Sequence, residues 1–91
     1  MKIEELKTRV PIQRLLLHLG TSVPTRNWSG WQALKCPFHE DRDPSASVNL
    51  AAGRFTCHGC KVKGDVIDLA KIVIGSADTR RAIEWLEMRF A

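Results

Sequence analysis

Two pairs of potential metal ligands constrain this chain more than any other feature of its sequence. Cys36 and His39 are separated by two residues, which is the spacing of a metal-binding turn. Cys57 and Cys60 are also separated by two residues, and seventeen residues lie between the pairs. Zinc bonds sulfur at about 2.3 Å, and a short turn directs both side chains of a pair towards one such point. Four ligands leave no open coordination position, so we expect one structural zinc ion, Zn2+, held by these residues.

Other interpretations of these residues remain open. Three cysteines are an odd number, so a disulfide framework would leave one thiol over, and buried cysteines also serve as small apolar side chains. His58 is a competing imidazole, but it lies inside the second pair and would share a turn with Cys57 and Cys60. We therefore expect His39 to be the nitrogen ligand. His18 is expected to be an ordinary surface or boundary residue.

Composition indicates one small globular domain. Of the 91 residues, 44% are hydrophobic and 26% are charged, which is ordinary for a soluble protein. The formal net charge is +4, which permits a polyanionic partner without requiring one. All apolar runs are much shorter than the roughly twenty residues of a membrane span. We expect no membrane contact and a cytoplasmic location.

Hydrophobic spacing predicts an α+β fold, with a short antiparallel sheet flanked by N- and C-terminal helices. Helices are expected at residues 3–8 and 11–19, with Gly20 ending the second. Strands are expected at 31–36, 45–50 and 54–57, followed by a basic turn at 61–64. Asp65 is expected to cap a helix that ends at Gly75, and Ser76 or Asp78 to cap a last helix.

These elements group into a single domain over residues 1–91. A helical lead-in occupies about 1–20, the zinc ribbon about 30–64, and the C-terminal helices about 65–90.

A longer pattern around the four ligands resembles a known family. It comprises CPFHEDRDPS over residues 36–45, Val48 and Phe55, CHGC over 57–60 and GDVI over 64–67. This combination resembles the zinc-binding domain, a CHC-type zinc ribbon, of bacterial and phage DnaG-type DNA primases. The resemblance covers nearly the whole chain.

The resemblance implies a DNA-binding accessory module of DNA replication and the primosome. Such a domain helps select the template site for primer synthesis, working with a separate catalytic primase domain or protein and possibly a helicase. The resemblance also implies zinc ligation by Cys36, His39, Cys57 and Cys60. The catalytic part of these primases is a much larger domain, so we expect no polymerase activity in this chain.

Four positions after the first ligand pair extend the comparison. The resemblance places Arg42 and the turn at 44–45 beside that face. One departure is Ala46, where the family often has a phenylalanine, so that either a stacking surface or a core contact is missing.

Binding a single DNA strand needs cations along its backbone and flat groups on which bases stack. Arg54 and Phe55 are adjacent on an expected strand and point to opposite sides, and we expect Phe55 to point inward. Five cations cluster around the expected sheet: Lys35, Arg42, Arg54, Lys61 and Lys63. The rings that could stack on bases there are Trp31 and His58.

Two alternatives to DNA binding remain. The five cations could form an ordinary solvated face. The zinc ribbon could be the scaffold of a protein–protein adaptor in a replication or mobile-element complex. In that case the helical ends, with Leu15, Leu16, Trp85 and Phe90, would dock onto the partner. A phosphate-binding face loses affinity steeply as salt rises, whereas an apolar groove does not, so salt dependence separates the two.

Overall fold

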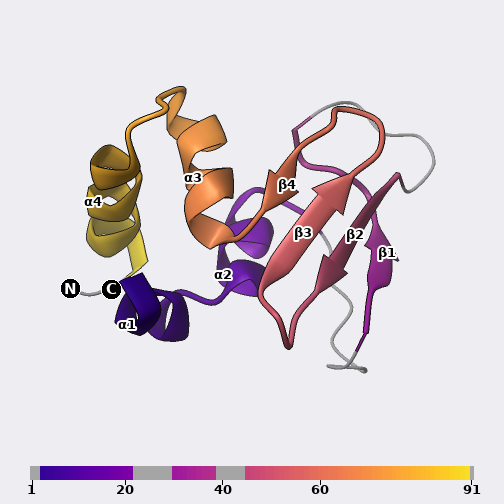
Figure 1. Cartoon of the computed structure of the whole chain (residues 1–91), viewed down its shortest axis with the longest axis horizontal. Helices are drawn as coiled ribbons and strands as arrows, with labels where there is room; N and C mark the ends of the chain where they lie inside the picture. Colours follow the sequence, from indigo (N-terminus) through magenta and orange to yellow (C-terminus); the bar gives the residue numbers. More distant parts are fainter. Residues whose placement is uncertain (1–2, 22–29, 39–44, 91) are drawn as a thin grey trace.

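A computed structural model of the chain describes residues 3–21, 30–38 and 45–90 (Figure 1). The predicted α+β class is confirmed. The elements are α1 (Ile3–Arg9), α2 (Ile12–His18), β1 (Gln32–Leu34), β2 (Ala46–Asn49), β3 (Arg54–Cys57), β4 (Lys63–Gly64), α3 (Val66–Ile74) and α4 (Thr79–Phe90). The strands form one antiparallel sheet in the order β1-β2-β3-β4. No helix in the described ranges is long and apolar enough to cross a bilayer.

The helices lie to one side of the sheet. In Figure 1, α1, α3 and α4 occupy one end of the molecule and the strands the other, with α2 between them. Pro11 separates α1 from α2 because its extended backbone, at ψ 154°, cannot continue the first helix. Both N-terminal helices were predicted to within a residue or two of their bounds. Leu15 and Leu16 are completely buried, so they belong to the core.

The pleat of the sheet separates a buried face from an outer face. Leu34, Val48 and Phe55 are at most 4% exposed and pack into the core. The prediction that Phe55 points inward is therefore confirmed, and Arg54 is exposed. Ala46 lies opposite Cys57 in the register and is 1% exposed. An aromatic ring at position 46 would thus enter the core, and its absence removes no stacking surface.

The predicted turn over residues 61–64 is wrong for residues 63 and 64, which form a strand. Lys63 pairs with Thr56, and Gly64 pairs with Phe55, which makes β4 a two-residue strand. A strand this short is defined by its pairing partner, which no local pattern reveals. Lys61 remains in the turn, at φ +62°. This left-handed backbone costs a non-glycine residue about 1 kcal/mol.

Helix α3 begins at the predicted cap. Asp65 Oδ1 accepts hydrogen bonds from the backbone N–H groups of Ile67 and Asp68, at 3.0 and 3.1 Å. Asp68 Oδ2 accepts one from the Asp65 N–H in return, at 3.0 Å, completing a capping box. Gly64 precedes this box at φ +139°, and a Cβ there would collide with the Asp68 side chain. Glycine is thus required where β4 meets α3.

Both other predicted helix boundaries in this region are also confirmed. Gly75 ends α3 in the left-handed conformation, at φ +67°. Asp78 caps α4, because its Oδ1 accepts from the Arg80 N–H at 2.9 Å. Ser76 instead accepts from the Asp78 N–H through its hydroxyl, so it supports the cap rather than forming it.

Asp65 also ties α1 to α3. Lys7 Nζ lies 2.7 Å from its Oδ2. Burial alone would raise the pKa of the Asp65 carboxyl. The hydrogen bond and charge of Lys7, together with the hydrogen bond from the Asp68 N–H, have the larger effect and lower this pKa. The carboxylate therefore stabilises the fold above its ordinary pKa near 4, and this contribution is lost as the pH falls through the lower folded value.

We predict that Asp65→Ala lowers the free energy of unfolding by about 1–2 kcal/mol at neutral pH, because the cap and the ion pair are lost together. Asp65→Asn is the matched control, since asparagine also caps helices but carries no charge. Chemical denaturation should rank the variants wild type, Asn, Ala. The Asn variant should also lose part of the acid dependence of stability. Equal stability of Ala and wild type would contradict the role of the cap.

Candidate metal centre and nucleic-acid interface

Three cysteine sulfurs converge at one end of the sheet. The Sγ atoms of Cys36, Cys57 and Cys60 all lie within 4.8 Å of one another. Cys36 Sγ and Cys60 Sγ are 3.6 Å apart. Sulfurs bound tetrahedrally to one zinc ion at about 2.3 Å would be about 3.8 Å apart. The donor set and its spacing therefore fit one structural zinc ion.

Two turns bring these sulfurs together. Cys36 follows β1, while Cys57 ends β3 and Cys60 lies in the turn that leads to β4. That turn is closed by a hydrogen bond of 2.8 Å from the Cys57 N–H to the Val62 carbonyl. Ligands far apart in sequence thus meet because β1 and β3 flank β2 in the same sheet.

Hydrogen bonds to sulfur orient the cysteines further. The Phe38 N–H points at Cys36 Sγ, 3.5 Å away, and Ser45 Oγ lies 3.5 Å from Cys57 Sγ. The ring of Phe38 also packs edge-on against Phe55, with centroids 6.0 Å apart, and so links the first turn to the core. Sequence reasoning assigned Phe38 and Ser45 to the family pattern but did not find these contacts with sulfur.

The electrostatics of the cluster favour a bound cation. Burial raises the pKa of the Cys36 thiol to about 12, and the neighbouring sulfurs add to this effect. Burial also opposes ionisation of Cys57, but hydrogen bonds from Ser45 and from the Cys60 backbone bring its pKa down to about 7. A metal dication stabilises all three thiolates, so its binding displaces the protons that the thiols otherwise keep.

The nitrogen ligand is not among the described residues of the cluster. Within those residues only the three cysteines are close enough together to hold a metal ion. His58 is exposed in the turn between Cys57 and Cys60 and is not part of the cluster. His39 lies outside the described residues. Its place as the fourth ligand is therefore a proposal that rests on its spacing from Cys36.

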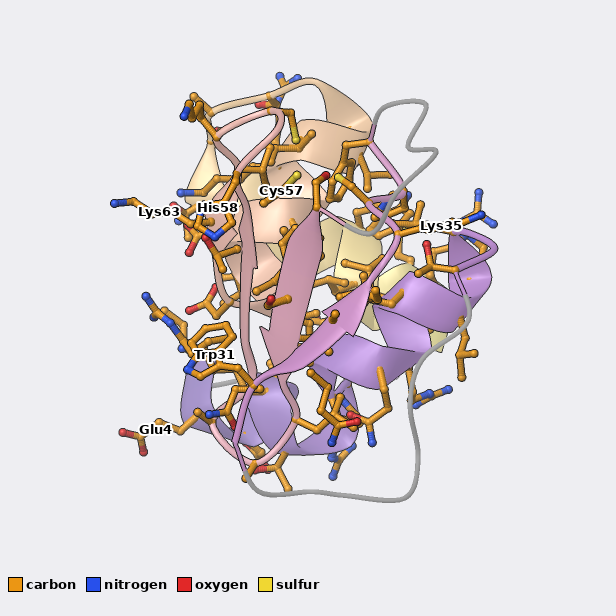
Figure 2. All side chains as sticks on the ribbon, turned by 90° about the vertical axis from the view of Figure 1, so that its right-hand side faces the viewer. Glu4, Trp31, Lys35, Cys57, His58 and Lys63 are labelled. Carbon is orange, nitrogen blue, oxygen red and sulfur yellow. The ribbon has the colours of Figure 1, made fainter. Side chains whose placement is uncertain are left out.

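The residues predicted to contact nucleic acid are spread over the two sides of the sheet. Figure 2 shows Trp31, His58 and Lys63 on one side and Lys35 on the opposite side. Trp31 is 54% exposed, and His58 and Lys63 are exposed as well.

Of the remaining predicted cations, two lie in the described part of the structure and one does not. Arg54 begins β3 on the outer face, and its side chain is exposed. Lys61 is exposed in the turn before β4. Arg42 lies outside the described residues, so it cannot be placed on either side.

His18 takes part in an aromatic cluster between α2 and α4. Its ring meets Trp85 and Phe90 edge-on, with centroids 6.1 and 5.4 Å away. Arg14 lies over the Phe90 ring and donates a hydrogen bond of 3.2 Å to its carbonyl. The histidine therefore helps to pack α2 against α4, as expected for a boundary residue.

Comparisons with known proteins agree with this geometry. A family model described as CHC2 zinc finger (Zn_ribbon_DnaG) matches residues 1–88. The DNA primase of Rickettsia prowazekii is 38% identical over 60 residues, covering 66% of this chain and 10% of the primase. The DNA primase of Myxococcus xanthus is 31% identical over 75 residues, covering 81% of this chain and 12% of the primase. The chain thus spans about a tenth of the length of these primases.

A shorter match involves a phage protein. The gene 58 protein of Mycobacterium phage D29 is 44% identical over 41 residues, which covers 45% of this chain and 32% of that protein.

We predict that Cys57→Ser removes zinc binding and cooperative folding together. Structural zinc in small domains contributes an apparent 10–16 kcal/mol, as much as the whole stability of a typical domain. Metal content and thermal unfolding, measured on the same samples, test this. His58→Ala serves as the control and should keep both zinc and the unfolding transition. Cooperative unfolding of a metal-free Cys57→Ser protein at the wild-type temperature would contradict a structural role for zinc.

Proposed function

Because the chain belongs to the CHC2 zinc-finger family, we propose that it is the zinc-dependent, single-stranded DNA-binding module of a DNA primase. In this proposal residues 1–91 act as one domain, with zinc held by Cys36, His39, Cys57 and Cys60. The domain helps to select the template site for primer synthesis. Catalysis belongs to a separate domain or protein, and the domain itself is an accessory to that enzyme.

The outer face of the sheet is the observation that carries this proposal. One row of register-paired residues crosses all four strands: Ala33, Ser47, Thr56 and Lys63. The first three have short side chains, and the fourth is a lysine at the β4 edge. With strands about 4.8 Å apart, the row makes a shallow surface roughly 14 Å wide. Such a surface leaves room for bases and backbone to approach closely.

Rings and cations frame this outer face. Trp31, 54% exposed at the start of β1, lies on the same side as His58 and Lys63 (Figure 2). An indole or imidazole offers a flat surface to a base, and stacking of this kind tolerates any base. Arg54 stands next to the row at the beginning of β3, where it could reach a phosphate. Each such phosphate contact releases counterions and makes binding depend on salt.

Zinc would act here through geometry. The metal centre joins the turn after β1 to the turn after β3, so it fixes the turn that carries His58 and leads to Lys63 on β4. Zinc supplies no reaction step in this proposal, because four protein ligands leave it without an open position.

An adaptor function remains the second candidate. The docking residues first considered for it need correction, because Leu15 and Leu16 are completely buried. Trp85 and Phe90 are partly buried and pack against the core. The observation that favours an adaptor is instead the exposure of Leu17 and Met88, which are 58% and 87% exposed on α2 and α4. An interaction through these residues would depend little on salt.

We predict that the double variant Arg54→Ala/Lys63→Ala binds single-stranded DNA about 25-fold more weakly at 0.1 M salt. Losing two phosphate contacts should also reduce the slope of log affinity against log salt by about 1.4. Fluorescence anisotropy with a labelled oligonucleotide, over a salt series, measures both quantities.

Arg80→Ala/Arg81→Ala is the matched control. It removes the same charge, but both arginines are exposed on α4, away from the strands. The control should bind within about twofold of wild type, since only long-range charge is lost. Equal losses in the two double variants would mean that net charge, and not the outer face, governs binding. Salt-independent binding that Met88→Ala abolishes would support the adaptor.

A further inference from the structure

A groove runs beside the second cysteine turn, between β4 and α3. Its volume is about 600 Å³, and it is widely open to solvent. One wall is the segment from Lys61 to Lys63, and the other is the face of α3 around Lys71, continued by residues 75–77. Lys71 was not among the residues that the sequence singled out for nucleic-acid binding.

Charge in this groove favours an anion. Lys61, Lys63 and Lys71 are the cations that line it, and Asp68 is the one acidic residue in its lining. The Asp68 carboxylate is already engaged, since its Oδ2 accepts the Asp65 N–H in the capping box. The carboxyl end of α3 adds roughly half a negative charge. Three lysines outweigh both negative contributions.

The last carbonyl groups of α3 are hydrogen-bonded, which reduces their repulsion of a bound anion. The N–H groups of Gly75 and Ser76 bond to the carbonyls of Ile72 and Lys71, at 3.2 and 3.0 Å. These bonds satisfy two of the carbonyls that would otherwise face the groove. Ile72 is 43% exposed and Val62 is half-buried, so the groove also offers apolar surface between its cations.

The backbone at Lys61 sets where this lysine stands relative to the groove. Lys61 is the only described non-glycine residue with positive φ, and glycine would adopt φ +62° without strain. This conformation belongs to the turn that directly follows Cys60. A lysine at this position places a cation at the entrance of the groove, next to the metal centre.

We propose that this groove binds the sugar–phosphate backbone of the single strand after it leaves the outer face of the sheet. The inference rests on the proposed DNA-binding function and extends its path. Lys63 joins the two surfaces, because it ends the row on the outer face and also lines the groove. Lys61 and Lys71 then contact phosphates further along the strand. Since phosphates carry no sequence information, the groove adds affinity and not base preference.

The test compares two oligonucleotide lengths on the zinc-loaded protein. A strand of about five nucleotides should occupy the outer face alone, and one of about fifteen should also reach the groove. Lys71→Met should weaken binding of the long strand about fivefold at 0.1 M salt and reduce its salt slope by about 0.7. Binding of the short strand should not change. The same loss is expected for every base sequence.

Lys61→Gly is a second variant that is expected to fold normally, so a loss of binding cannot be attributed to unfolding. It relieves the left-handed backbone, so its unfolding temperature should equal or exceed that of wild type, while long-strand affinity falls. Arg80→Met is the matched control for Lys71→Met, because Arg80 is exposed on α4 and does not line the groove, and it should keep full affinity for both strands.

The outcomes separate this inference from the proposed function. If Arg54→Ala, which lies outside the groove, weakens binding but Lys71→Met and Lys61→Gly bind the long strand normally, the groove inference is wrong and the function stands. If wild type binds neither strand, both are wrong. If Lys71→Met weakens binding of ATP but not of the long strand, the groove is a nucleoside triphosphate site and the inference is overturned.

Discussion

The meeting of three cysteine sulfurs at one end of the sheet is the constraint on which the rest of the structure depends. Cys36 follows β1, Cys57 ends β3, and Cys60 lies in the turn after β3. Burial makes the Cys36 thiol costly to ionise without a cation, and the chain belongs to a family of zinc fingers. Zinc therefore supplies the cross-link that a sheet of strands only two to four residues long would otherwise lack.

Two layers of structure follow from this cross-link. The buried face of the sheet packs Val48 and Phe55 against the helices, and Phe38 connects that core to the metal centre. The outer face is left with short polar residues, framed by Trp31 and His58. A surface held flat by a core on one side and a metal at one end is well suited to receive an extended strand. Helix α4, whose Trp85 and Phe90 meet His18 of α2, lies at the opposite end of the molecule from the strands (Figure 1).

Much of this architecture could be predicted from the sequence because the signals are local. Ligand spacing predicted the sulfur cluster, and the Asp65 and Gly75 boundaries follow from capping preferences. The failures concern properties set by neighbours in space. The pairing of Lys63 with Thr56, the burial of Leu15 and Leu16, and the approach of Lys71 to the turn after Cys60 all depend on how distant elements pack.

The central claim is that the zinc-stapled sheet presents its outer face to single-stranded DNA. The most direct measurement is a titration of the isotope-labelled, zinc-loaded protein with a short oligonucleotide, followed by amide chemical shifts. The account predicts that the largest shifts fall on Ala33, Ser47, Thr56 and Lys63, together with the indole N–H of Trp31. Shifts confined to α2 and α4, around Leu17 and Met88, would contradict it.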